Sequence, residues 1–184
     1  MRFGQDPENQ LCTDDFAGHW AHNANLSVKA IMGMAGYSEM AKMLGFNNIA
    51  DKYATIAKKM AVKWEEMANE GDHYRLAFDR EDTWSQKYNM IWDKMWNLNL
   101  FPNNVIGKEI NYYLTKQNPY GLPLDSRKDY TKSDWIMWTA AMSSDQVTFE
   151  KFVDPLYKYI NETVSRVPVS DWYDTKTAQM TGFK

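Results

Sequence analysis

Six stretches of the sequence place apolar residues three and four positions apart, and this spacing is the feature that most constrains the fold. It is typical of amphipathic helices, whereas the alternation typical of strands is almost absent. The predicted helices cover approximately residues 25–44, 48–69, 83–98, a fourth from 102 to beyond 113, 131–142 and 145–163. The sequence therefore predicts an all-α fold.

Residues at the ends of these stretches indicate where several helices begin and end. Asn25 is the predicted N-cap of the first helix, and Gly45 follows its last turn. Residues 83–86 and 131–134 have the pattern of N-terminal caps for the third and fifth helices, with Asp134 as a capping residue. The apolar stripe of the first helix is predicted to comprise Leu26, Ala30, Met34, Tyr37, Ala41 and Leu44.

The links between the predicted helices alternate between short and long. Short links join the helices in pairs and lie at residues 45–47, 99–103 and 143–144. Long connections cover residues 70–82, 117–130 and 164–184, and a long segment up to residue 22 precedes the first helix. Because a short link makes an antiparallel helical hairpin, all the long connections should emerge at one end of the domain. We call this end the loop face.

Charge and composition exclude several classes of partner. The formal net charge of -3 and the pI near 5.6 provide no positive field for nucleic acid or an anionic membrane. No apolar run approaches the roughly 20 residues of a membrane-spanning helix, and the first residues lack the apolar segment of a signal peptide. A single cysteine, Cys12, excludes an internal disulfide. There is no glycine-rich phosphate loop, and we predict no cofactor.

Aspartates gather in the long connections, whereas most glutamates fall within the predicted helices. The preference of aspartate for turns and caps explains roughly half of this distribution. Three aspartates beside basic or aromatic residues are the candidate catalytic carboxylates, namely Asp125, Asp171 and Asp174. A carboxylate pair with aromatic side chains nearby suits glycoside hydrolysis, in which one acid protonates the leaving oxygen and the other activates water or attacks.

Other residues of the long connections are candidates for substrate binding. Arg127 can hold a substrate carboxylate with its planar fork or pair with Asp129 within the loop, and the sequence leaves both open. His19 and His22 lack a metal-binding spacing, so we interpret them as hydrogen-bonded histidines and predict no metal site. Cys12 and His19 have the residue types of a nucleophile–base pair, although lone cysteines are more often packed. The predicted substrate-binding residues are Arg127, Ser126, Trp172, Trp84, Asp15 and His19.

Five segments carry a family resemblance. They lie at residues 12–19 (Cys-Thr-Asp-Asp-Phe-Ala-Gly-His), 23–27, 84–89, 121–127 (Gly-Leu-Pro-Leu-Asp-Ser-Arg) and 167–174. Taken in order, they resemble the C-terminal helical domain of the glutaminase A family. The resemblance implies antiparallel helical hairpins that form part of an (α/α) toroid of the six-hairpin glycosidase type. It also implies that residues 1–184 form a single helical domain, the C-terminal part of a larger secreted or periplasmic protein whose other domains are its partners.

Three functions remain open at this point, because a fold alone does not decide function. The family name implies hydrolysis of the side-chain amide of L-glutamine, with Asp125 or Asp171 as the base for water and Arg127 holding the substrate carboxylate. A second hypothesis is glycoside hydrolysis by an aspartate pair on the same face. A third is a non-catalytic structural or carbohydrate-binding half of the toroid, in which Trp172 or Trp84 binds a ligand without turnover. The expected ligand is a small molecule or a carbohydrate.

Overall fold

The computed structural model describes residues 3–102 and 104–182, so Asn103 in the second short link and the last two residues of the tail lie outside it. The helices in the described ranges are α1 (Ala24–Met43), α2 (Asn47–Ala68), α3 (Ile91–Met95), α4 (Val105–Leu114), α5 (Ser133–Ala141) and α6 (Gln146–Glu162). Two short 3-10 helices, η1 (Asp15–Ala17) and η2 (Tyr88–Met90), and three strands, β1 (Tyr130–Lys132), β2 (Trp172–Asp174) and β3 (Met180–Gly182), complete the described elements. None of these helices is long and apolar enough to cross a bilayer.

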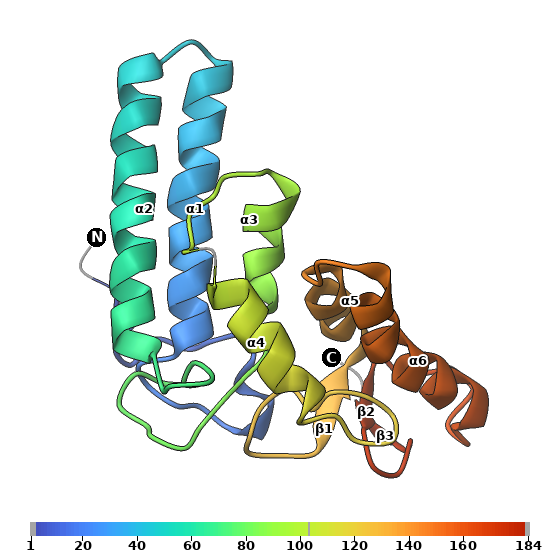
Figure 1. Ribbon diagram of the computed structural model, residues 1–184. Helices are drawn as coiled ribbons and strands as arrows, with labels where there is room; N and C mark the ends of the chain where they lie inside the picture. The colour runs from blue at the N-terminus through green and yellow to red at the C-terminus, as the bar shows by residue number, and fades with distance from the viewer. Residues whose placement is uncertain (1–2, 103, 183–184) are drawn as a thin grey trace.

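The helices are arranged so that their long connections meet at one end. α1 and α2 form a tall antiparallel hairpin, α5 and α6 form a shorter pair, and α4 lies between the two groups (Figure 1). The link between α1 and α2 is at the top of Figure 1, whereas the segments around β1, β2 and β3 and the connection that follows α2 are at the bottom. The prediction of a single loop face is confirmed.

Two predicted helix caps are wrong. Asn23, and not Asn25, caps α1, because the Asn23 side chain accepts a hydrogen bond from the Leu26 N–H at 2.9 Å. Asn25 is instead fully buried. α5 begins without a side-chain cap, and Asp134 is exposed in its first turn. The expected capping segment is not free to cap, since Thr131 belongs to β1 and pairs with β2.

The buried face of α1 also differs from the predicted stripe. Its most deeply buried apolar residues are Ala24, Val28, Ile31, Ala35 and Ala41, of which only Ala41 was predicted. Leu44, placed in the predicted stripe, is 71% exposed. The spacing misled because α1 is apolar on nearly every side, with Lys29, Glu39 and Lys42 as its only charged residues, so that more than one stripe fits the helical period.

The third predicted helix is much shorter than expected. Residues 83–87 are not helical, and only η2 and α3 remain of the stretch. The Gln86 side chain does not cap a helix. It donates to the backbone oxygens of residues 122 and 123 at 3.2 and 3.0 Å and accepts from the Thr139 hydroxyl at 2.9 Å. Gln86 thus forms its hydrogen bonds with residues that are distant in sequence. The capping pattern of residues 83–86, which spans only four residues, does not form.

A three-stranded antiparallel sheet, in the order β1-β2-β3, lies on the loop face. Tyr130 pairs with Asp174, and Lys132 pairs with Trp172. Each strand has three residues, which is too short to show alternation in the sequence. The all-α prediction therefore holds for the scaffold and misses this sheet.

Buried aromatic residues attach the loop face to the helices. Trp64 of α2 donates from its indole N–H to the backbone oxygen of the first residue of α1 at 2.8 Å. Tyr113 of α4 donates to the Ser85 backbone oxygen at 2.8 Å. Tyr159 of α6 stacks on Tyr173 of β2 with ring centroids 3.5 Å apart. All three contacts are buried. The first joins α2 to α1, and the other two hold Ser85 and β2 in defined positions against the helices.

Candidate functional site

A polar cavity of about 220 Å³ opens on the loop face, and we call it the Asp125 pocket. Its walls come from the long connections before α3 and after α4. They are Trp84, Lys116, Asn118, Pro123, Asp125, Ser126, Arg127, Lys128 and Asp129. Four of the predicted site residues, Asp125, Ser126, Arg127 and Trp84, therefore lie in one cavity.

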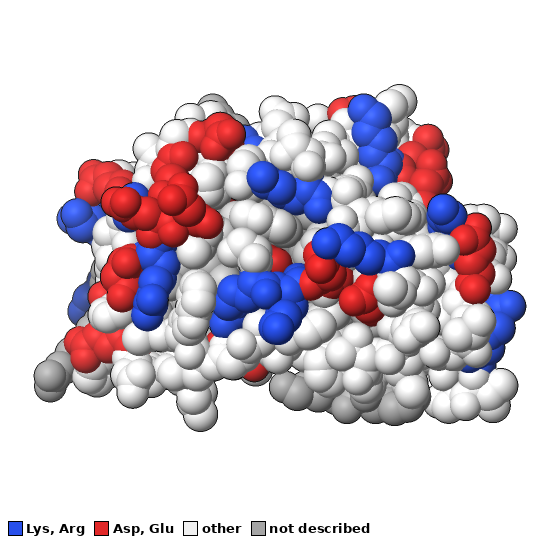
Figure 2. All heavy atoms as spheres, turned by 90° about the horizontal axis from the view of Figure 1, so that it is seen from below, with Lys and Arg blue, Asp and Glu red and all other residues white. Residues whose placement is uncertain are grey.

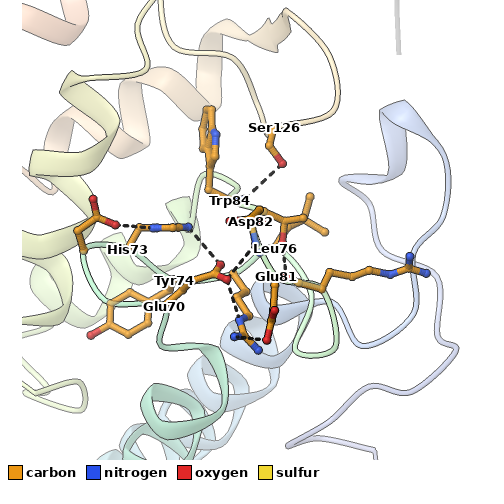
Figure 3. A network of polar contacts seen from close by, with 12 residues as sticks. Glu70, His73, Tyr74, Leu76, Glu81, Asp82, Trp84 and Ser126 are labelled. Atoms are coloured by element: carbon orange, nitrogen blue, oxygen red, sulfur yellow. Dashed lines mark hydrogen bonds and ion pairs between the residues drawn. The ribbon is translucent and has the colours of Figure 1, made fainter.

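Backbone pairing shapes the turn that carries the central residues of this pocket. Asp125 forms β-bridges with Ser85 and with Lys128. The Ser126 N–H donates to the Trp84 backbone oxygen at 3.0 Å, and the Trp84 N–H donates to the Ser126 hydroxyl at 3.3 Å, the contact drawn in Figure 3. The connection before η2 therefore determines how the 125–128 turn presents its side chains.

Arg127 and Asp125 form a bidentate ion pair. Nη2 of Arg127 lies 2.7 Å from Oδ2 of Asp125, and Nε lies 3.1 Å from Oδ1. The remaining terminal nitrogen, Nη1, donates to the Gly18 backbone oxygen at 2.6 Å, and the guanidinium lies 4.9 Å from the centroid of the Trp20 ring. Arg127 thus pairs with Asp125, not with Asp129, and its fork is filled by a carboxylate of the same chain.

The second carboxylate of the pocket is also paired, whereas two lysines are not. Asp129 accepts from Lys176 Nζ at 2.9 Å and from the Asn118 side-chain amide at 3.3 Å. Among the described residues, neither Lys116 nor Lys128 forms a salt bridge. Figure 2, which views the loop face from below, shows Lys and Arg side chains near its middle with acidic side chains on both sides.

A polar network behind the pocket positions one of these lysines. The His73 ring stacks on the Tyr112 ring with centroids 4.1 Å apart, and Lys116 Nζ lies 4.6 Å from the centroid of the same Tyr112 ring. His73 is held from both sides, with Nδ1 2.7 Å from an Asp72 oxygen and Nε2 3.3 Å from a Glu70 oxygen (Figure 3). Carboxylates on the 69–86 connection therefore hold an aromatic stack that reaches Lys116.

A buried ion pair lies beneath the same connection. Lys87 and Glu109 are both fully buried, and Lys87 Nζ donates to the backbone oxygens of Tyr74 and Ser85 at 3.0 and 2.9 Å. Burial lowers the pKa of Lys87 and raises the pKa of Glu109, because it disfavours the charged form of each. The pair thereby ties Ser85, the bridge partner of Asp125, to the core.

The other two predicted catalytic aspartates lie outside the Asp125 pocket. Asp171 pairs with Lys132 across the sheet. Asp174 accepts hydrogen bonds from the backbone N–H groups of Lys176 and Thr177 at 2.9 and 2.8 Å, so it closes its own turn. Each carboxylate therefore has a structural partner within the loop face.

The predicted binding residues Trp172, Asp15 and His19 form contacts of a different kind. Trp172 packs edge-on against Phe16, with ring centroids 5.0 Å apart. Nδ1 of His19 lies 2.9 Å from an Asp15 oxygen, and Nε2 lies 3.1 Å from the Asn9 side-chain oxygen. In the ranges 3–102 and 104–182 no three His, Cys, Asp or Glu side chains are grouped to hold a metal ion.

A second polar cluster, which the sequence did not single out, surrounds Asp14 at the start of α1. We call it the Asp14 cluster; its members are Cys12, Thr13, Asp14, Asn25, Lys29 and Tyr88. The Asp14 carboxylate accepts from Lys29 Nζ at 3.0 Å, from Thr13 at 3.2 Å, and from the Asn25 amide and the Tyr88 hydroxyl. The cluster brings together three segments that are distant in sequence, residues 12–14, residues 25–29 and Tyr88, so no spacing pattern could have revealed it.

Cys12 belongs to this cluster and does not pair with His19. Its sulfur lies 3.7 Å from Lys29 Nζ. Burial, assisted by the charge of Asp14, raises the pKa of the Cys12 thiol to about 12. A thiol with this pKa is almost entirely protonated at neutral pH, so the cysteine is not an activated nucleophile.

The sequence comparisons define the class of protein to which this scaffold and site belong. The chain is a member of the family described as the glutaminase A six helical-hairpin domain, whose family model matches residues 1–184. The resemblance drawn from the loop motifs is thus confirmed.

Two curated relatives cover nearly the whole chain. Glutaminase A of Aspergillus oryzae is 35% identical over 175 residues, which are 93% of this chain and 25% of that protein. A probable glutaminase of Arthroderma benhamiae is 34% identical over 212 residues, which cover 96% of this chain and 24% of that protein. The chain therefore spans about a quarter of the length of the curated relatives it matches.

Proposed function

We propose that this chain supplies the substrate pocket of a hydrolase that cleaves the side-chain amide of L-glutamine, and that the Asp125 pocket is this site. The observation that carries the proposal is the Asp125 pocket itself, a small cavity on the loop face with carboxylates and ammonium groups in its walls. Glutamine is a zwitterion with a neutral amide, so a small cavity with both signs of charge suits it. The names of the two curated relatives support the same reaction.

In the proposed reaction Asp125 is the general base. It takes a proton from a water molecule, whose oxygen attacks the amide carbon of the substrate. The proton then passes to the departing nitrogen, so that glutamate and ammonia leave and Asp125 is restored. Arg127 orients the carboxylate, because its fork holds both carboxylate oxygens. In this proposal Asp171 and Asp174 stabilise the loop face.

The proposal includes an (α/α) toroid of which these helices are a part. α2 has seven charged residues in 22, as a surface helix does, whereas α1 has three in 20, as a helix covered on several sides does. A cavity of about 400 Å³, lined by Gly36, Glu39, Met40, Met43 and Trp96, runs along the uncovered side of α1. Further helices of the parent protein are the proposed cover.

The test uses the full-length parent protein. We expect ammonia release from L-glutamine, and we expect Asp125→Asn to lower kcat/KM by about 100-fold. Asp154→Asn, on the exposed side of α6, is the matched control and should retain activity. Circular dichroism checks that each variant is folded. Wild-type protein that releases no ammonia would disprove the reaction, and a folded, fully active Asp125→Asn would disprove the base.

The two alternative functions have less support in the structure. Glycoside hydrolysis needs two carboxylates that can act at one site, whereas Asp129, the second carboxylate of the Asp125 pocket, is held by Lys176 and Asn118. Asp171 and Asp174 are held by Lys132 and by their own turn. A carbohydrate-binding role needs an open aromatic ring face, and Trp84 is only 7% exposed. For these reasons amide hydrolysis is the function we retain.

A further inference from the structure

We propose that Lys116 and Lys128 bind the α-carboxylate of the substrate and thereby make the Asp125 pocket select free L-glutamine over glutamine inside a peptide. The inference rests on the proposed function and adds to it the group that the site recognises. A peptide-internal glutamine has no α-carboxylate, so the same two lysines would distinguish the two substrates.

The first argument is the distribution of charge in the pocket. Asp125 and Asp129 both line the cavity. Asp125 forms an ion pair with Arg127, and Asp129 forms one with Lys176. Lys116 and Lys128 line the same cavity, and among residues 3–102 and 104–182 no carboxylate lies within ion-pair distance of either ammonium. Lys116 interacts at longer range with the exposed carboxylate of Asp72. Once the internal pairs are formed, the pocket therefore retains two positive charges, which favours an anionic ligand group.

The second argument is that the chain limits how far both lysines can move. Lys116 is half-buried beside Tyr112, whose ring also stacks on the His73 ring. Lys128 is exposed, but its backbone is bridged to Asp125 across a tight turn. A solitary surface lysine needs no ligand to explain it, since its charge is solvated. Two unpaired lysines in the walls of one cavity, of which one is held by an aromatic stack, are better explained by a shared anion.

The third argument comes from Arg127. The sequence left it free to hold the substrate carboxylate, but in the structure its fork is occupied by Asp125 and its third nitrogen by Gly18. If a substrate carboxylate took the fork, it would leave the Asp125 charge without its partner, at a cost in free energy. Binding at Lys116 and Lys128 leaves the Asp125–Arg127 pair intact.

The experiment compares two substrates in variants of the full-length parent. L-Glutamine carries the α-carboxylate, and L-glutaminamide replaces it with a neutral amide while keeping the reacting side chain. Chromatography of glutamate and of isoglutamine reports cleavage of the side-chain amide in each. The variants are Lys116→Gln, Lys128→Gln and the double variant. Lys158→Gln is the matched control, because Lys158 also lies over a tyrosine ring, 4.9 Å from the Tyr120 centroid, but on α6.

We expect the double variant to raise KM for L-glutamine about 30-fold with kcat nearly unchanged, because two charge-assisted hydrogen bonds to the ground state are lost. The KM for L-glutaminamide should not change in any variant, and Lys158→Gln should behave as wild type. Equal effects on the two substrates, or no effect on either, would overturn the inference while the proposed function stands.

A binding measurement separates the two proposals if the wild-type protein releases no ammonia. Calorimetry with L-glutamate then tests the pocket directly. Binding that is weakened about 30-fold in the double variant would support the carboxylate site although the proposed reaction had failed. If wild-type protein does not bind L-glutamate, or if the double variant binds it as tightly as wild type, the carboxylate site is overturned as well.

Discussion

The Asp14 cluster and the Asp125 pocket are both rich in charge, yet they differ in how completely their groups are paired. In the Asp14 cluster, the carboxylate accepts four hydrogen bonds, and the Lys29 ammonium has an acceptor for each of its three protons. In the Asp125 pocket the carboxylates are paired, but in the described chain no carboxylate lies within ion-pair distance of Lys116 or Lys128. Charged side chains are present in both regions, so their presence alone does not identify a site.

The difference indicates separate roles for the two regions. A fully paired cluster around a buried carboxylate holds segments together, since opening it would leave that charge unpaired in a poorly solvated place. Here the cluster joins the segment before α1 to α1 itself and to η2 through Asp14, Lys29 and Tyr88. A pocket with unpaired cations can exchange solvent for a ligand at little structural cost. We therefore assign stability to the Asp14 cluster and recognition to the Asp125 pocket.

The largest effect expected from this comparison concerns the reactivity of Cys12. At pH 8 its alkylation in the folded protein should be roughly a thousandfold slower than in urea, because the folded pKa of about 12 leaves far less thiolate than the ordinary value of 9.0. Mass spectrometry of the peptide that contains Cys12 measures the rate. Raising the pH toward 12 should speed the reaction. Rapid alkylation of folded protein at pH 8 would show that the Asp14 cluster is open.

The next largest effect is on stability. Asp14→Asn should lower the free energy of unfolding by about 3 kcal/mol, because Lys29 is left without its anion. Urea titration of the full-length parent measures the change, with Asp154→Asn as a control near zero. Adding Lys29→Met to Asp14→Asn should recover part of the loss, since no unpaired charge then remains. A single variant as stable as wild type would mean that the cluster does not contribute to folding.

The smallest effect is expected in the Asp125 pocket. Lys128→Gln should change the free energy of unfolding by less than about 0.5 kcal/mol, because this exposed side chain has no carboxylate partner in the described ranges. The same urea titration applies. A loss above about 1.5 kcal/mol would show that Lys128 has a structural role, and the contrast between the two regions would then fail.

Much of the scaffold could be predicted from the sequence, because its signals are local. Helical spacing and link length predicted the α1–α2 and α5–α6 hairpins and the single loop face, and the loop motifs predicted the family. The third predicted hairpin was wrong, because α3 has only five residues and does not pack along α4. The errors occurred where a local pattern competed with distant partners. Residues 83–86 resemble a helix cap, but the Gln86 side chain is hydrogen-bonded to the 121–131 connection and to Thr139. The strands were missed because three residues show no alternation.

The candidate site was predicted only in part. Asp125, Ser126, Arg127 and Trp84 do meet in one cavity, but Lys116 and Lys128 went unnoticed, because a surface lysine carries no distinctive local signal. The pairing of Arg127 with Asp125, where the sequence had offered Asp129, depends on the backbone bridges that shape the 125–128 turn.

By itself, then, the sequence determined that this chain forms helical hairpins with one polar loop face, since apolar periodicity and link length are properties of neighbouring residues. Only the tertiary structure decided which charges neutralise one another and which remain for a ligand. Coulomb interactions depend on distances in space, and several ion pairs of this protein join residues that lie 15 to 47 positions apart along the chain.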